Sequence, residues 1–129
     1  MHYFRIDDLP STETLPGVDR RAVWLDDVML TFFTFEPGAT IPEHAHPNEQ
    51  ITVVIEGALE LTLGEETQTL HAGAGVCIPP NVLHKARVLD ERTVAYDAWA
   101  PPREDYKTAR GLQDLALDET DETVNVASP

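Results

Sequence analysis

Residues 38–57 read GATIPEHAHPNEQITVVIEG, and this stretch decides how the whole chain is interpreted. It holds His44, His46 and Gln50, all at even-numbered positions. Side chains two and four residues apart along an extended strand lie on one face. The spacing therefore predicts that these three point into one interior, with Glu49 pointing away. Imidazole nitrogens and an amide oxygen suit one divalent transition metal ion per chain, such as Zn, Ni, Mn or Fe.

A fourth candidate ligand, His84, ends the segment GAGVCIPPNVLH at 73–84. There an apolar strand at 76–78 runs into a Pro-Pro-Asn turn, which positions the histidine to face back toward the same interior. A lone histidine is more often an ordinary surface or satisfied residue. Three of them with an oxygen ligand at this spacing indicate a metal site. Four protein ligands leave one or two coordination positions open, which favours a catalytic over a closed structural site.

The chain from 18 to 103 predicts an all-β domain, an antiparallel barrel or jelly roll, because short strands alternate with Gly, Pro and Asp turns. The expected strands span 18–24, 28–35, 51–55, 59–63, 67–70, 76–78, 86–89 and 93–99. Residues 1–17 are expected to form a loosely packed N-terminal arm. Residues 104–129 are expected to form an acidic tail, with a possible short helix near 104–116 followed by disorder.

The composition narrows the possible partners. The chain of 129 residues carries 23 acidic against 9 basic residues, a net charge of −14, which argues against nucleic acid and anionic membranes as partners. It has no apolar run of about 20 residues and no signal-peptide pattern at its start, so a cytoplasmic location is expected. The single cysteine, Cys77, excludes an internal disulfide and is expected to be a small buried core residue. His71 and His2 are interpreted as surface residues.

A second group of polar and aromatic residues lies in the strand 93–99 and its exit, TVAYDAWAPPREDY at 93–106. Asp97 and Trp99 share parity, so one face of this strand can present a carboxylate beside an aromatic wall. Arg103 follows a rigid Pro-Pro turn and suits a bidentate grip on a carboxylate. In the alternative interpretation, Asp97 points outward, Trp99 is core and Arg103 pairs with a surface acid.

The two histidine segments resemble the motifs of the cupin superfamily. Five residues fit the first motif spacing for spacing, with a glutamine in place of the usual glutamate: Gly38, His44, His46, Gln50 and Gly57. Three residues fit the second motif: Gly73, Pro79 and His84. Asn81 replaces the turn glycine, and both residue types tolerate positive φ. Val88 replaces the final asparagine.

Four segments resemble those of the small single-domain cupins in the KdgF pectin/alginate-degradation group: HPNEQ, EG, GAGVCIPPNVLH and YDAWAPPREDY. HPNEQ departs from the more usual HPHEQ. The resemblance implies metal ligands at His44, His46, Gln50 and His84, with Asp97, Trp99 and Arg103 acting on substrate. It also implies a small sugar-acid substrate and opening of 4,5-unsaturated monouronates to the linear 4-deoxy-5-keto form.

Three interpretations remain open at this point. The first is a metal-dependent isomerase of small sugar acids, the second a cupin dioxygenase, and the third a non-catalytic ligand-binding cupin. An enzyme needs Asp97 and Arg103 to face the metal cavity, whereas a passive binder needs no proton-transfer group. A homodimer is expected, because small cupins usually pair through their sheets and the strand 28–35 is apolar on both faces.

Overall fold

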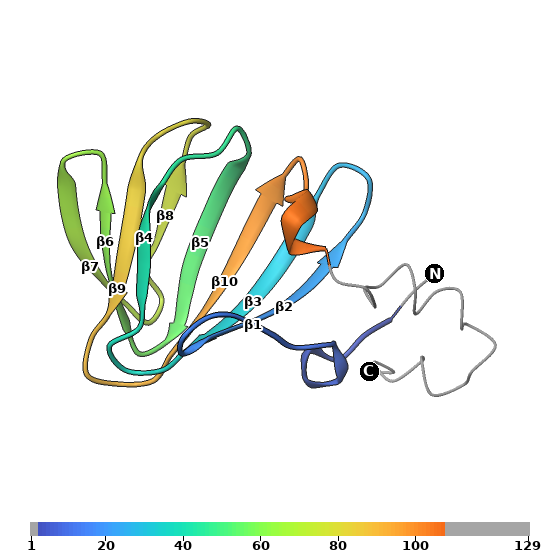
Figure 1. The fold of residues 1–129 in the computed structure, drawn as a ribbon, viewed down its shortest axis with the longest axis horizontal. Coiled ribbons are helices and arrows are strands. Elements are labelled where there is room, and N and C mark those ends of the chain that lie inside the picture. Colours follow the sequence, from blue (N-terminus) through green and yellow to red (C-terminus); the bar gives the residue numbers. More distant parts are fainter. Residues whose placement is uncertain (1–2, 108–129) are drawn as a thin grey trace.

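Two antiparallel sheets face each other and form a β-barrel (Figure 1). The computed structural model describes residues 3–107, and this part of the chain contains ten strands and two short 3-10 turns. The larger sheet has the strand order β1-β2-β3-β10-β5-β8, and the smaller has β4-β9-β6-β7. The strands are β1 (Thr12–Leu15), β2 (Val18–Trp24), β3 (Met29–Phe35), β4 (Thr40–His44), β5 (Glu49–Glu56), β6 (Ala58–Leu63), β7 (Glu66–His71), β8 (Gly75–Ile78), β9 (His84–Val88) and β10 (Thr93–Ala100). The predicted all-β jelly-roll fold is confirmed.

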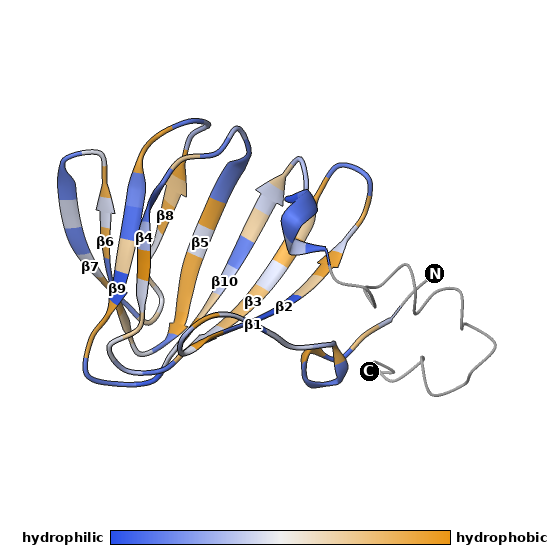
Figure 2. Cartoon of the chain, viewed as in Figure 1, coloured by the Kyte–Doolittle hydropathy of each residue, from blue (hydrophilic) through white to orange (hydrophobic). Residues whose placement is uncertain are grey.

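Alternating side chains explain how the strands bury one face. In β6, Leu59 and Leu61 are buried while Glu60 and Thr62 are partly exposed. The same alternation runs along β10, where every second residue is buried. Figure 2 shows the contrast between strands: β7 is mainly hydrophilic, whereas β5 is hydrophobic over much of its length. One apolar face per strand is what two facing sheets need to build a shared core.

The main core lies between the two sheets. Its buried apolar side chains come from both of them: Val18, Phe33, Phe35, Ala39, Val54, Leu59, Leu61, Leu70, Val88 and Ala95. Phe33 and Phe35 stack with ring centroids 5.4 Å apart and planes 4° apart. This core fills part of the barrel interior and supports the polar side chains beside it.

Two turns depend on unusual backbone angles. Gly57, between β5 and β6, has φ +84°, and a Cβ there would lie 2.5 Å from the carbonyl oxygen of Arg92. Only glycine fits such a position. Asn81, in the turn before β9, has φ 63°. The expectation that Asn81 replaces a turn glycine at positive φ is confirmed.

The N-terminal arm is more ordered than the sequence suggested. β1 pairs with β2 at the edge of the larger sheet. Ahead of it, a 3-10 turn at Ile6–Asp8 leads to Leu9, which is buried against Val23 and Phe32. All four side chains of β1 are exposed, so the strand is held by backbone pairing and leaves no apolar pattern to detect. The arm packs against the outward face of Phe32.

Cys77 corrects another prediction, because it is exposed instead of lying in the core. β8 is an edge strand of the larger sheet, and its register places Cys77 opposite Ile51 on β5. Ile51 itself is 55% exposed. The apolar appearance of residues 76–78 therefore reflects an uncovered outer sheet face, where parity puts Cys77 outside and Ile78 inside.

Only the first residues of the expected C-terminal tail belong to the described part of the chain. Residues 104–107 are described and form a 3-10 turn at Glu104–Tyr106. The rest of the expected acidic tail, with its helix and disorder, lies outside the described residues, as does His2. His71 is exposed, as expected. No helix within residues 3–107 is long and apolar enough to cross a membrane.

Candidate metal centre

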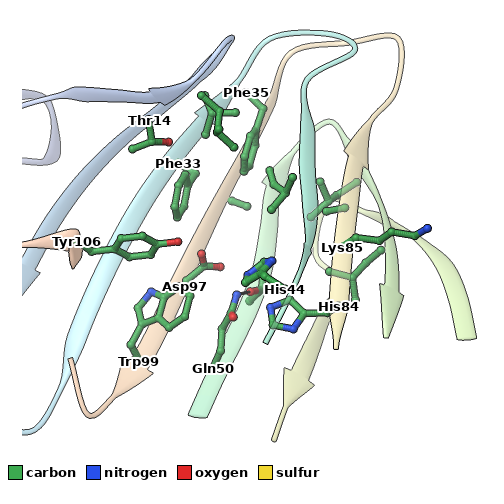
Figure 3. Close-up of a pocket in the computed structure, with 18 residues that line it drawn as sticks. Thr14, Phe33, Phe35, His44, Gln50, His84, Lys85, Asp97, Trp99 and Tyr106 are labelled. Carbon is green, nitrogen blue, oxygen red and sulfur yellow. Dashed lines mark hydrogen bonds between the residues drawn. The ribbon is translucent and has the colours of Figure 1, made fainter. Parts of the chain in front are cut away.

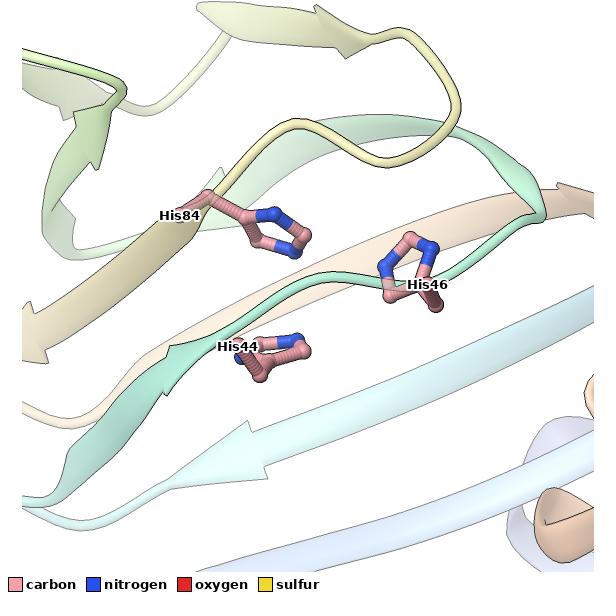
Figure 4. Close-up of side chains that lie close together, drawn as sticks. All are labelled: His44, His46 and His84. Carbon is pink, nitrogen blue, oxygen red and sulfur yellow. The ribbon is translucent and has the colours of Figure 1, made fainter.

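Three histidines meet at one end of the barrel (Figure 4). His44 ends β4 and His84 begins β9, and these two residues are register partners across the smaller sheet. His46 lies in the loop between β4 and β5. The ring centroids are 4.2 Å apart for His44 and His84, 4.9 Å for His46 and His84, and 5.5 Å for His44 and His46. One nitrogen from each ring lies within 4.8 Å of the others, a grouping able to hold a metal ion.

Backbone carbonyls orient all three rings in the same way. Nδ1 of each histidine lies within hydrogen-bond distance of a carbonyl oxygen two residues away: 2.8 Å for His44 and Pro42, 3.1 Å for His46 and Asn48, and 2.8 Å for His84 and Val82. Since Nδ1–H donates to a carbonyl, Nε2 of each ring keeps its lone pair for a metal.

The electrostatic setting of the rings also suits metal binding. Burial lowers the pKa of His46 and His84, and the positive charge of Arg103 acts in the same direction. Both rings are therefore neutral at pH 7, the form that binds metals. The buried Nε2 of His84 has no hydrogen-bond partner among the described residues, although buried polar atoms are normally satisfied. A metal ion would satisfy it.

Gln50 joins the three histidines from the opposite sheet. It lies on β5, is 9% exposed, and its Oε1 is 3.0 Å from Nε2 of His46. Its Nε2 donates to Oγ1 of Thr52 at 2.9 Å, and this bond fixes which end of the amide faces the histidines (Figure 3). The oxygen is therefore the end available to a metal.

The structure brings His44, His46 and Gln50 together as expected, but the parity argument behind that expectation is wrong. His44, His46 and Gln50 do not share one strand, because β4 ends at His44 and β5 begins at Glu49. They converge because the chain crosses from one sheet to the other between them. Glu49 is exposed, as expected from its position beside Gln50 in β5.

Asp97 lies inside the barrel between two threonines. Its register partners are Thr31 on β3 and Thr52 on β5. Thr31 Oγ1 donates to Asp97 Oδ2 at 3.4 Å, and Thr52 also hydrogen-bonds this carboxyl group. Asp97 is only 5% exposed, and its Oδ1 has no partner within residues 3–107. The alternative that Asp97 points outward is excluded.

Burial raises the pKa of Asp97 to about 7, although the hydrogen bonds from the two threonines act in the opposite direction. Near neutral pH the carboxyl group is therefore present in both protonation states. A group of this kind can accept and return a proton at physiological pH.

Trp99 is both a core residue and a cavity residue, and Arg103 pairs with a surface acid while keeping one unpaired nitrogen. Trp99 is 2% exposed, yet it lines the cavity and packs against His46 with ring centroids 5.1 Å apart. Its Nε1 donates to Thr31 at 2.9 Å. Arg103 donates to both oxygens of Asp105, from Nε at 3.0 Å and from Nη2 at 2.7 Å. Its buried Nη1 has no partner in the described part of the chain, so one guanidinium nitrogen remains available.

Asn48 connects the loop between β4 and β5, which carries His46, to the segment that carries Arg103. Its Nδ2 donates to the carbonyl of Pro101 at 2.7 Å and lies 3.4 Å from that of Pro102. Asn48 is 6% exposed. The asparagine that departs from the usual HPHEQ pattern thus ties the end of β10 to the histidine loop.

The cavity beside the histidines measures about 90 Å³. Figure 3 shows Asp97, Gln50, His44 and His84 facing it together, with Trp99 and Tyr106 on the β10 side. Apolar side chains, among them Phe33 and Phe35, also line the cavity. Arg103 and His46 are not among the lining residues, although His46 touches Trp99 and Gln50, which are.

Four residues at or beside this site were missed by the sequence analysis: Thr31, Thr52, Asn48 and Tyr106. A sequence signal was available for the threonines: Thr31 and Thr52 are polar residues in the middle of apolar strands, and Thr52 shares parity with Gln50. Tyr106 stood in the quoted PREDY run without an assigned role. Nothing in the sequence marked the contact from Asn48 to Pro101, because the partner is a backbone carbonyl 53 residues away.

Comparison with known proteins identifies relatives of the chain. The family described as Cupin domain matches residues 31–98. The pectin degradation protein KdgF of Dickeya dadantii (strain 3937) is 31% identical over 106 residues, which cover 81% of this chain and 96% of that protein. The solved structure of KdgF from Halomonas sp. has a TM-score of 0.76 and 28% identity, covering 80% of this chain and 96% of that one. An RmlC-like cupin from Shewanella frigidimarina NCIMB 400 has a TM-score of 0.78 and 25% identity, covering 83% and 96%.

Proposed function

The chain belongs to the cupin family, and from that premise we propose that it is a metal-dependent enzyme acting on small sugar acids. The finer proposal is ring opening of 4,5-unsaturated monouronates to the linear keto form. The observation that carries it is a carboxyl group with a pKa near 7, Asp97, in the same cavity as the histidine cluster. The relative from Dickeya dadantii, a pectin degradation protein, supports the substrate class.

The residues present fit a divalent metal ion. His44, His46 and His84 would supply imidazole nitrogens, and Gln50 would supply an amide oxygen. The orphaned Nε2 of His84 and the fixed amide of Gln50 support this ligand set. When bound, the ion would act as a Lewis acid on a substrate oxygen, and a neutral glutamine would leave it the full +2 charge that a glutamate would reduce. We propose Zn, Ni, Mn or Fe, one ion per chain.

The proposed reaction is an isomerisation that moves one proton. The hydroxyl on C1 of the cyclic substrate loses its proton, C1 becomes a carbonyl, and the bond from C1 to the ring oxygen breaks. The ring oxygen keeps the electron pair and becomes the enolate oxygen on C5. Protonation at C4 then gives the C5 ketone. Asp97 takes the first proton on its free Oδ1 and returns one to C4, which a carboxyl group with a pKa of about 7 can do.

Arg103 and Trp99 would hold the substrate during this step. Arg103 does not itself line the cavity, but its guanidinium lies 5.3 Å from the ring centroid of Trp99, which does, and its unpartnered Nη1 is suited to the uronate carboxylate. Trp99 offers an aromatic wall to the sugar ring. The net charge of −14 repels an anionic substrate at long range. The metal and Arg103 offset this repulsion locally, and salt screens it.

The test is turnover of an unsaturated monouronate, followed by loss of the ultraviolet absorbance of its C4–C5 double bond. We expect Asp97→Asn to abolish turnover while metal content stays at the wild-type level. Asp27→Asn, at an exposed position in the β2–β3 turn, is the matched control and should keep full activity. Full activity in Asp97→Asn would contradict the assigned role. A metal-loaded wild type without any turnover would favour the ligand-binding interpretation.

Location and assembly belong to the same proposal. We propose a cytoplasmic homodimer that binds neither nucleic acid nor membranes. The acidic charge supports the exclusion of both polyanions. The dimer is supported by a row of outward side chains on the larger sheet, in which register aligns Cys77, Ile51, Ala98 and Leu30 across four adjacent strands.

A further inference from the structure

Tyr106 is a cavity residue that the proposed reaction has not yet used. It ends the 3-10 turn Glu104–Tyr106 that follows β10, and it lines the same cavity as Asp97 and the histidines. Figure 3 shows its hydroxyl group pointing into the cavity toward Asp97, on the side away from His84. Its ring meets Trp99 edge-on, with centroids 5.2 Å apart, and meets Phe33 at 6.2 Å.

Two guanidinium groups lie over this ring. The Cζ atoms of Arg20 and Arg103 are 4.3 Å and 4.2 Å from the ring centroid. A cation over an aromatic face is attracted by the ring quadrupole, most strongly where water is excluded. Tyr106 is therefore held by two cations as well as by Trp99 and Phe33.

The burial of Arg20 opposes folding unless other contacts stabilise its charge. It occupies an inward position of β2, where the other inward residues are Val18, Ala22 and Trp24. The side chain is 6% exposed, and its Nε has no hydrogen-bond partner among residues 3–107. Burying a charged group with an unsatisfied donor opposes folding. Its contact with the Tyr106 ring and the nearby charge of Asp105 both stabilise the cation in this apolar row.

The hydroxyl group of Tyr106 is suited to donate a hydrogen bond. Burial raises the pKa of Tyr106 above its usual value of 10, so the phenol keeps its proton across the neutral range. In the proposed step, negative charge develops on the ring oxygen as the bond to C1 breaks. A fixed neutral donor stabilises such an oxygen without transferring its own proton.

We propose that the Tyr106 hydroxyl contacts the bound sugar acid and donates a hydrogen bond to the ring oxygen as it becomes the enolate, with Arg20 as the positioning residue for the tyrosine ring. This inference rests on the proposed function for its substrate class. Three groups would then act together: a metal ion held by the histidines would polarise one substrate oxygen, Asp97 moves the proton, and Tyr106 stabilises the negative charge that develops on the ring oxygen.

The first test compares two tyrosine variants in the metal-loaded protein. Tyr106→Phe removes only the hydroxyl and should lower kcat about 10- to 100-fold, with KM changed by about 2-fold or less, because the bond strengthens in the transition state. Tyr96→Phe is the matched control. Tyr96 lies on the same strand as Asp97 but on the other face, edge-on to Phe32 at 5.0 Å, and its variant should keep wild-type kcat. A kcat within 2-fold of wild type in Tyr106→Phe would overturn the proposal.

The second test asks whether the effect of Arg20 on kcat depends on the Tyr106 hydroxyl. Arg20→Met should lower kcat to a similar extent, and the double variant Arg20→Met/Tyr106→Phe should be no slower than Tyr106→Phe alone. Such non-additivity shows that Arg20 acts through the tyrosine hydroxyl. Arg20→Lys keeps a cation and should recover part of the lost rate. Independent, multiplying losses would mean that Arg20 only stabilises the fold.

The third test separates this inference from the proposed reaction. The chain has three tyrosines, so 3-fluorotyrosine labelling gives three fluorine resonances that Tyr→Phe variants assign. D-galacturonate, a saturated sugar acid without the C4–C5 double bond, serves as the probe. We expect it to shift the resonance of Tyr106 and not that of Tyr96. A Tyr106 shift in a protein that fails to turn over unsaturated uronates would refute ring opening and keep the contact. No Tyr106 shift would overturn the contact even if turnover is observed.

Discussion

Replacing Asp97 by asparagine should stabilise the metal-free protein at high pH. Burial raises the pKa of this carboxyl group from 3.8 to about 7 in the folded protein. Between these values the unfolded chain releases the Asp97 proton while the folded protein keeps it. The unfolded state then binds fewer protons, so the free energy of unfolding falls as pH rises, by about 1.4 kcal/mol per pH unit. The whole interval corresponds to about 4 kcal/mol.

The assay is urea unfolding of wild type and Asp97→Asn from pH 3.5 to 9, after removal of metal by a chelator. The difference between the two proteins isolates Asp97, because the other 22 acidic residues are common to both. At the lowest pH the two should be about equally stable. By pH 8 the variant should be more stable by up to about 4 kcal/mol, with no further change above that pH. A stability difference that stays constant from pH 4 to pH 8 would refute the conclusion that burial raises the pKa of Asp97.

Three further predictions concern the metal site and the assembly. Elemental analysis of protein purified without an affinity tag should find about one Zn, Ni, Mn or Fe per chain, lost in His44→Ala; an ion retained in that variant would contradict the ligand set. Thr52→Val removes the acceptor that fixes the amide of Gln50 and should weaken metal affinity about 10- to 100-fold, whereas the exposed Thr69→Val should not change it. Ile51→Glu places a charge in the apolar row of the larger sheet and should convert a dimer to a monomer in light scattering, while a wild type that is already monomeric would refute the dimer.

The sequence predicted the barrel well because its signals were local. Alternating apolar residues, Gly/Asp turns and the two histidine segments each depend on a few neighbouring positions. The strands 18–24 and 59–63 were identified almost to the residue. β1 was missed because pairing at a sheet edge uses backbone groups, which leave no side-chain pattern. Cys77 was misplaced because an apolar residue on an edge strand looks the same whether its face is covered or not.

The site depends on contacts that a local pattern does not encode. Thr31 and Asp97 are 66 residues apart, and Trp99 donates to a threonine 68 residues away. Only the strand order of the larger sheet, with β10 between β3 and β5, brings these groups together. Arg103 differs from these groups, because its partner Asp105 is only two residues away and engages two of its nitrogens. In the proposed function, this ion pair would orient the guanidinium toward a substrate carboxylate.

The proposed metal site and the proposed proton-transfer group, Asp97, are connected through Gln50 and Thr52. The amide of Gln50 offers its oxygen to the histidine cluster and donates from its nitrogen to Thr52, which hydrogen-bonds Asp97. A cation bound to the amide oxygen makes the amide nitrogen a stronger donor, and its charge favours the ionised form of a nearby carboxyl group. Metal loading should therefore lower the pKa of Asp97 and release protons. In the unfolding experiment, the interval over which wild type loses stability relative to Asp97→Asn should then end at a lower pH, and the total loss should be smaller, because the lower limit is set by the unfolded chain. The pKa of about 7 therefore describes the metal-free protein, and in the proposed enzyme a bound metal ion would favour the ionised carboxylate that accepts the first proton.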